Sequence, residues 1–93
     1  MRKIIHAAGI SEDAILLALS HESGKDLAGI KEMLIKDGYG CNISHLARLR
    51  DSLKRKGLID VVGDINHYLS HEGEFRVARL LAEAIQSKES AVA

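Results

Sequence analysis

The segment at residues 42–59, NISHLARLRDSLKRKGLI, constrains the fold of this chain more than any other. At about 100° per residue along an α-helix, Leu46, Leu49 and Leu53 fall on one narrow arc. The polar and basic residues of the opposite arc are Ser44, His45, Arg48, Ser52 and Arg55. The run KRKG at the end places cations near the negative end of the helix dipole and supplies a glycine that can end the helix. The segment therefore predicts a helix that packs through its leucines, shows a basic face to solvent and leads directly into a strand.

Three further helices and one hairpin are expected from capping residues and hydrophobic patterns. Ser11, Asp26 and Ser70 can each accept hydrogen bonds from the free backbone N–H groups of a first helical turn. The first helix is apolar nearly all round, which is typical of a buried central helix. The expected elements are a helix from about Ala14, a second after Asp26, a third after Asn42 or Ser44, strands at 58–62 and 67–69, and a last helix from about Glu72 to Gln86. This order predicts a mainly α fold with a small β-hairpin.

With 93 residues, 46% of them hydrophobic and 28% charged, the chain has the composition of one globular domain. We expect an N-terminal arm at 1–10, a domain at 11–86 that includes the last helix, and a flexible tail at 87–93. No apolar run approaches the roughly 20 residues of a membrane span, and the N-terminus lacks the apolar stretch of a secretory signal. The single Cys41 cannot close an internal disulfide, which fits a reducing compartment. These features predict a cytoplasmic protein that does not bind a membrane.

Two segments resemble winged-helix transcriptional regulators of the PadR and MarR families. The first, DLAGIKEMLIKDGYGCNISHLARLRDSLKRKGLI at 26–59, is similar to the part of these proteins whose third helix ends in a leucine, basic residues and Gly-Leu-Ile. The second, YLSHEGEFRVARLL at 68–81, resembles the Leu-Ser/Thr-x-x-Gly turn through which they pass from the wing into a C-terminal helix. The resemblance implies a winged helix-turn-helix fold and a homodimer on double-stranded DNA with two related half-sites. The third helix would lie in the major groove and the wing along the DNA backbone.

The formal net charge is +0, but residues 11–40 are net negative and residues 41–60 are net positive. Positive charge concentrated in this way can contact a few phosphates, and salt should weaken such binding steeply. Arg48 is expected to contact a guanine, whereas Arg50 lies nearer the leucine arc and should border the core or pair with an acid. The residues predicted to bind DNA are Ser44, His45, Arg48, Ser52, Arg55 and Lys56, with Arg2 and Lys3 as a basic arm. The alternative is that this basic face is simply solvated.

The predicted wing does not fit the DNA hypothesis, because its tip is GDIN and Asp60 flanks it. An acidic tip is repelled by a phosphate backbone. Either the wing stays off the DNA or the protein binds something else. The alternative function is therefore a winged-helix module that contacts a protein partner without binding DNA.

The last helix carries two apolar stripes on different sides. The first consists of Phe75, Ala78, Leu81 and Ile85, and the second of Val77, Leu80 and Ala84. One stripe can cover the domain's own core, while the other would be left in water unless a second subunit covers it. We expect the second stripe, together with Ile4 and Ile5, to form a homodimer interface. The alternative is that the domain buries both stripes itself.

The sequence shows no clear catalytic or cofactor-binding motif. Cys41 and His45 have the spacing of a helical metal pair, as do His67 and His71, but neither pair is expected to lie within a single helix. No Ser-His-Asp arrangement, glycine-rich phosphate loop or pair of catalytic carboxylates stands out. The sequence therefore predicts a protein that is not an enzyme and that holds neither a cofactor nor a metal.

Overall fold

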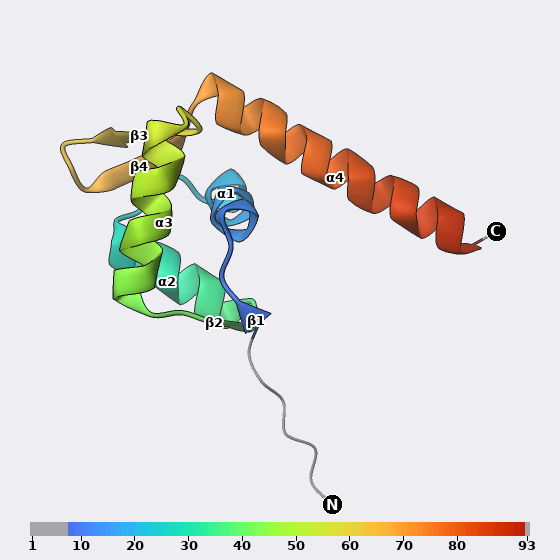
Figure 1. Ribbon diagram of the computed structural model, residues 1–93, viewed down its shortest axis with the longest axis horizontal. Helices are drawn as coiled ribbons and strands as arrows, with labels where there is room; N and C mark the ends of the chain where they lie inside the picture. Colours follow the sequence, from blue (N-terminus) through green and yellow to red (C-terminus); the bar gives the residue numbers. More distant parts are fainter. Residues whose placement is uncertain (1–7, 93) are drawn as a thin grey trace, which may run out of the picture.

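A computed structural model describes residues 8–92 of the chain, and the side chains of 9–86. The elements in chain order are β1 (Ala8–Gly9), α1 (Glu12–His21), α2 (Leu27–Lys36), β2 (Tyr39–Gly40), α3 (Ile43–Arg55), β3 (Ile59–Val62), β4 (Asn66–Leu69) and α4 (His71–Val92) (Figure 1). The predicted order of helix, helix, helix, hairpin, helix is confirmed. Arg2, Lys3, Ile4 and Ile5, which were predicted to contact DNA or a second subunit, lie outside the described residues.

Side-chain caps start the helices where the sequence predicts them. Ser11 Oγ accepts a hydrogen bond from the Ala14 amide at 3.1 Å, and Ser70 Oγ accepts one from the Gly73 amide at 3.1 Å. The remaining caps are Asp26, which accepts from Gly29 at 2.8 Å, and Asn42, which accepts from Ser44 at 2.8 Å and His45 at 3.3 Å. Asn42 rather than Ser44 therefore caps α3. At the other end of α3, Gly57 has a φ of 74°, the left-handed conformation expected of it.

The hydrophobic core is built around α1, which packs against α2, α3, α4 and β4. Its apolar side chains face neighbours on several sides, as expected for a helix that is apolar nearly all round. The largest fully buried apolar side chains are Ile15, Leu16 and Leu19 of α1, Ile30 and Leu34 of α2, and Leu46 and Leu53 of α3. Leu49 is partly buried against the same core, so the leucine arc of α3 packs inward as predicted.

Two small sheets complete the fold. Strands β3 and β4 form an antiparallel hairpin, the wing, in which Ile59 pairs with Leu69 and Val62 pairs with Asn66. An isolated bridge from Lys25 to His67 ties this hairpin to the segment between α1 and α2. Strands β1 and β2 pair in parallel, so part of the predicted N-terminal arm is joined to the segment where the sequence predicted only a turn.

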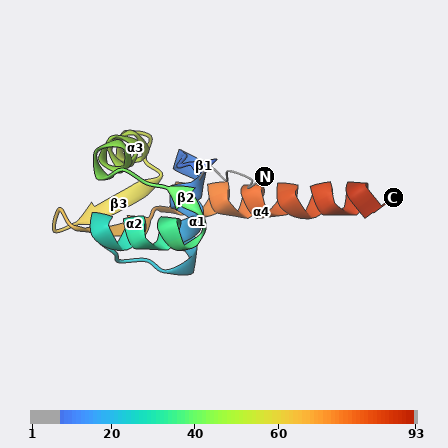
Figure 2. The same ribbon diagram turned by 90° about the horizontal axis from the view of Figure 1, so that it is seen from below.

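Helix α4 begins against the body of the molecule and then projects beyond it (Figure 2). It ends at Val92, so the helix end predicted near Gln86 is wrong. The sequence SKESAV that follows Gln86 contains neither glycine nor proline, and nothing in it stops a helix that is already formed. The division of the chain into an arm, a domain and a flexible tail stays a prediction.

Candidate nucleic-acid interface

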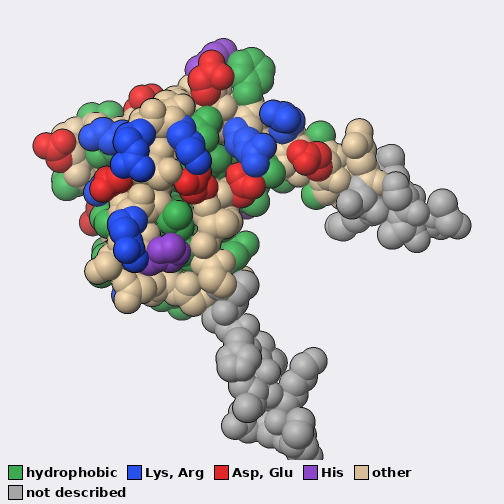
Figure 3. All heavy atoms as spheres, viewed as in Figure 1, with side chains coloured by type: hydrophobic (Ala, Val, Ile, Leu, Met, Phe, Trp, Pro, Cys, Tyr) green, Lys and Arg blue, Asp and Glu red, His purple; other side chains and the backbone are tan. Residues whose placement is uncertain are grey.

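The outward face of α3 carries several of the side chains predicted to bind DNA. Ser44, His45, Arg48 and Arg55 are all exposed. Neither Arg48 nor Arg55 forms an ion pair with any acid among residues 9–86. Figure 3 shows Lys and Arg side chains over this side of the molecule. Because both guanidinium groups are free and point away from the core, this face can meet a charged or hydrogen-bonding partner.

Ser52 and Lys56 are held differently, because the carboxylate of Glu12 binds both. Ser52 Oγ donates a hydrogen bond to Glu12 Oε2 at 2.8 Å, and Lys56 Nζ donates to Glu12 Oε1 at 2.7 Å. The pKa of the Glu12 carboxyl is lowered, and the main cause is the hydrogen bond from Lys56. Burial raises this pKa, whereas the hydrogen bond from Ser52 and the charges of Lys56 and Arg55 lower it further. A DNA phosphate would have to compete with Glu12 for these two side chains.

Sequence reasoning missed this role of Glu12. The sequence shows only an acid in the first turn of α1, where the helix dipole alone explains it. The partners of Glu12 lie forty or more positions away in the chain, and no local pattern connects them.

A buried hydrogen-bond network joins α3 to the wing through His67, whose exposure is only 1%. Arg50 Nη1 lies 3.2 Å from His67 Nε2, and since a guanidinium cannot accept, Nε2 must be the acceptor. The ring proton is therefore on Nδ1, which donates to the Lys25 carbonyl oxygen at 2.8 Å. Arg50 Nε also donates to Asp51 Oδ1 at 2.6 Å. The expectation that Arg50 borders the core or pairs with an acid is confirmed, since it contacts the buried His67 and pairs with Asp51.

The wing is apolar and acidic on its exposed side. Gly63, Asp64 and Ile65 form the loop of the hairpin, and Gly63 and Asp64 both have a φ of 64°, a conformation that glycine and aspartate tolerate better than most residues. Val62 is 56% exposed and Ile65 is 59% exposed, while Asp60 and Asp64 supply negative charge. Residues 58–69 contain neither Lys nor Arg. The wing therefore offers no cation to a phosphate.

The stripe of α4 that was predicted to face a second subunit is the one that begins against the domain's own core. Val77 is 6% exposed and belongs to the domain's own core, so it is not available to a second subunit. Leu80 of the same stripe is half-buried, whereas Ala84 is exposed. The exposed apolar side chains belong to the other stripe: Phe75 at 60%, Leu81 at 52% and Ile85 at 58%.

Gly73 explains the orientation of α4. A Cβ built on Gly73 would lie 2.0 Å from the carbonyl oxygen of Leu58, so the start of α4 lies against the backbone before β3. Gly73 shares one side of the helix with Val77 and Leu80, which turns that side towards the core. Arg76 fixes the same orientation, since its Nε and Nη2 donate to the two carboxylate oxygens of Asp13 at 3.2 and 3.0 Å.

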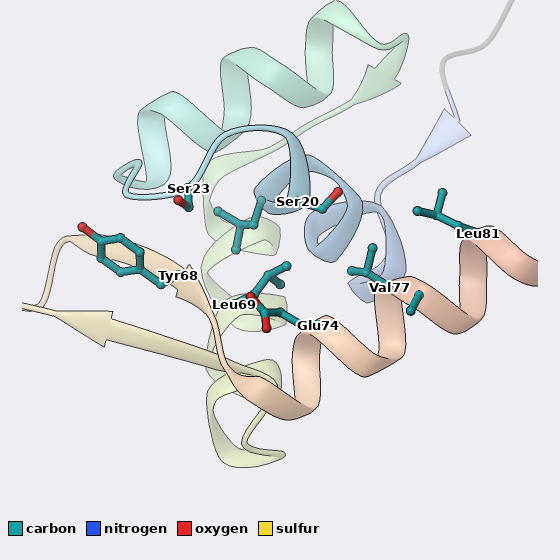
Figure 4. A pocket seen from close by; sticks show the side chains of 9 residues that line it. Ser20, Ser23, Tyr68, Leu69, Glu74, Val77 and Leu81 are labelled. Atoms are coloured by element: carbon teal, nitrogen blue, oxygen red, sulfur yellow. The ribbon is translucent and has the colours of Figure 1, made fainter.

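A groove of about 440 Å³ lies between α1, β4 and α4. Figure 4 shows Tyr68 and Leu69 on one side of it and Val77 and Leu81 on the other, with Ser20 and Ser23 above. Leu81 belongs both to this groove and to the exposed stripe of α4. The groove therefore continues the uncovered apolar surface of the helix.

These elements define a winged helix-turn-helix fold, in which α2 and α3 are the helix pair and β3 and β4 are the wing. The structure is similar to that of the MarR family transcriptional regulator SPO1453 from Silicibacter pomeroyi DSS-3, with a TM-score of 0.68 and 18% sequence identity. That match covers 86% of this chain, which spans only 56% of the MarR family protein. The structure is also similar to F-93 of SSV1, with a TM-score of 0.61 and 15% identity over 92% of this chain and 99% of that one. The winged-helix fold implied by the sequence resemblance is thus confirmed.

Comparison at the level of sequence adds no family, because no family model and no curated protein matches the chain. In the described part of the chain, no group of three or more His, Cys, Asp or Glu side chains is placed to hold a metal ion. None of the helices described is both long and apolar enough to cross a membrane.

Proposed function

We propose that this protein is a transcriptional regulator that binds double-stranded DNA as a homodimer, with α3 of each protomer in the major groove. The observation that carries the proposal is the outward face of α3, where Arg48 and Arg55 are exposed and form no ion pair among the residues described. On a winged-helix fold this is the face that enters a DNA groove. The similarity of the fold to a MarR family transcriptional regulator supports the same function.

Each side chain of this face has a proposed role. Arg48 reads a guanine through two parallel hydrogen bonds, and Ser44 and His45, at the start of the helix, contact a base edge or a phosphate. Arg55 contacts the backbone near the other end of α3. Lys56 and Ser52 join only if they leave Glu12, so they contribute less than their position in the sequence indicates.

Fluorescence anisotropy with a mixed pool of labelled duplexes tests the proposal at low and at moderate salt. The parent should bind at low salt and lose affinity steeply as salt rises. The double variant Arg48→Ala with Arg55→Ala should not bind. The matched control is Lys25→Ala with Lys36→Ala, which removes the same charge from a surface formed by α2 and the segment before it. Equal binding by the Arg48/Arg55 variant and the parent would refute α3 as the reader.

The homodimer is proposed to form through the exposed stripe of α4 and the adjoining groove. In such a dimer Phe75, Leu81 and Ile85 would be removed from water. Full burial of a side chain of this kind stabilises a contact by roughly 1.5–3 kcal/mol. The projecting part of α4 is accessible to a second copy (Figure 1). The stripe is therefore the best surface for an isologous contact.

Sedimentation equilibrium at micromolar concentration tests this interface. The parent should be a dimer, and Leu81→Glu with Ile85→Glu should be a folded monomer. Val62→Glu with Ile65→Glu is a matched control, since these side chains are equally exposed but lie on the wing. A parent that sediments as a monomer would refute the dimer.

The wing favours a second candidate function, contact with a protein partner in place of DNA. Its acids and its exposed aliphatic side chains suit a basic, partly apolar protein surface better than a phosphate backbone. The salt titration separates the two functions, because a protein that only contacts proteins shows no salt-dependent binding to any duplex.

A further inference from the structure

We infer that the DNA backbone beside α3 is held by a basic ridge that runs onto α4, and not by the wing. The basic ridge comprises Lys54, Arg55 and Lys56 at the end of α3 and Arg76 and Arg79 on α4. Its ligand is a phosphodiester, and Arg79 is its main contact on α4. This inference rests on the proposed DNA-binding function and adds Arg76 and Arg79, which the sequence did not single out.

The wing cannot supply phosphate contacts of the usual charged kind. It contains no Lys or Arg between Leu58 and Leu69, and Asp60 and Asp64 are both exposed. Two carboxylates beside a phosphate backbone repel it, and their removal from water would add to the penalty. A duplex seated on α3 therefore needs backbone contacts on the other side of that helix.

The structure joins the end of α3 to α4 on that other side. Lys56 binds Glu12, Arg76 binds Asp13, and these two acids are neighbours at the start of α1. The last turn of α3, the start of α1 and the start of α4 thus form one continuous charged surface. Figure 3 shows Lys and Arg side chains in a row from the region of α3 to the start of α4, all visible from the same side of the molecule.

The ridge is net positive, since its cations outnumber Glu12 and Asp13. Arg79 lies about one helical turn after Arg76, is exposed, and forms no ion pair among the side chains described. Glu83, the next acid along α4, does not pair with it in that part of the chain either. Arg79 can therefore bind a phosphate without first breaking a contact within the protein.

On α4, the basic ridge and the side chains Leu81 and Ile85 of the proposed dimer interface lie on different sides of the helix. At about 100° per residue, Arg76 and Arg79 lie on one side of the core-facing stripe, and Leu81 and Ile85 lie on the other. A second copy that covers Leu81 and Ile85 leaves the basic side open, and the two surfaces meet at Phe75, which lies one turn before Arg79. The same helix can then serve both the protein contact and the phosphate contact.

The experiment measures affinity over a range of salt, with the whole 93-residue chain, for a duplex that the parent selects from the mixed pool and for a duplex of unrelated sequence. Arg79→Ala should weaken binding to specific and unrelated duplexes alike, and should reduce the slope of log affinity against log salt by about 0.9, the value for one phosphate contact. Lys36→Ala is the matched control and should leave the slope unchanged. Because Arg79 makes no ion pair in the described part, far-UV circular dichroism and sedimentation should not distinguish Arg79→Ala from the parent.

A second variant tests the wing. Asp60→Asn with Asp64→Asn removes both charges and keeps a residue type that tolerates the positive φ at position 64. If the wing stays off the DNA, affinity should change by less than about twofold and the slope should not change. A several-fold gain in affinity would place the wing on the backbone and overturn the inference.

The remaining outcomes separate the inference from the proposed function. If Arg48→Ala with Arg55→Ala abolishes binding and Arg79→Ala changes neither slope nor affinity, the inference is wrong and the DNA-binding function stands. If the parent binds no duplex at low salt, both are wrong.

Discussion

Replacing Gly73 with alanine should destabilise the protein, although the same change normally stabilises a helix. Alanine is favoured over glycine within a helix by about 1 kcal/mol. At Gly73, however, the added Cβ would lie 2.0 Å from the Leu58 carbonyl oxygen, so the two must separate by about 1 Å to reach even the shortest Cβ contacts. The same oxygen accepts a hydrogen bond from the Ser70 amide at 3.1 Å, and the separation would stretch that bond.

The expected size follows from these contacts. Crowding around the added Cβ destabilises the protein by about 1–3 kcal/mol, and loss of the hydrogen bond from Ser70 to Leu58 by about 1 kcal/mol. The higher helix propensity of alanine offsets about 1 kcal/mol of this loss. The net loss is about 2 kcal/mol, which lowers the melting temperature by roughly 10 °C in a domain of this size. Urea unfolding followed by far-UV circular dichroism measures it, at one fixed protein concentration because a dimer's stability depends on concentration.

Gly29→Ala is the matched control for this prediction. Gly29 is also helical, but a Cβ there would meet only side-chain atoms of Lys25 and Asp26, at 3.1 to 3.2 Å. These side chains can move, so Gly29→Ala should be close to neutral or slightly stabilising. If Gly73→Ala is as stable as Gly29→Ala, α4 does not approach Leu58 as closely as described, and the explanation for the orientation of its stripes fails.

His67→Ala should lower the free energy of unfolding by about 3 kcal/mol, because it removes the two hydrogen bonds of the imidazole, to Arg50 and to the Lys25 carbonyl oxygen, and leaves a cavity in place of a buried ring; urea unfolding measures this, and an unchanged midpoint would contradict the network. The hydrogen bond from Lys56 holds the folded-state pKa of Glu12 below its ordinary value of 4.5, so the contribution of Glu12 to stability should be present above that pH and be lost as the pH falls through the folded pKa. Melting temperatures measured from pH 6 to pH 3 should therefore fall more for the parent than for Glu12→Gln, and parallel curves would show that Glu12 does not hold Lys56 in solution.

The sequence predicted those parts of the fold that depend on neighbouring residues. The caps at Ser11, Asp26 and Ser70 use side chains that bind amides three positions away, so the starts of the helices were visible in the sequence. The inward arc of α3 follows from periodicity alone, and so does the position of Arg50 at its edge. The order of the elements, and with it the winged-helix fold, could be predicted for the same reason.

Features that depend on distant residues could not be predicted in this way. Both stripes of α4 are apolar, and the choice between them depends on the contact of Gly73 with Leu58 and of Arg76 with Asp13. The pairing of β1 with β2 joins segments too short to carry a strand pattern. For the predicted DNA surface, the exposed face of α3 could be predicted from the sequence, but the contacts of Glu12 with Ser52 and Lys56 near the end of α3 could not.

The contacts of α3 and α4 with α1 bear on how a dimer would read DNA. The end of α3 is held by Glu12, its middle is held to the wing through Arg50 and His67, and Asp13, next to Glu12, holds α4. In the proposed dimer, α4 forms the interface, so a short path of direct contacts connects that interface to each recognition helix. Any rotation of α4 relative to α1 would have to break the two hydrogen bonds of Arg76 or carry the start of α1, and therefore Glu12, with it. In that dimer the packing of α4, and not a flexible linker, would set the distance between the two recognition helices. A fixed distance is needed to bind two half-sites that lie one helical turn of DNA apart, about 34–36 Å.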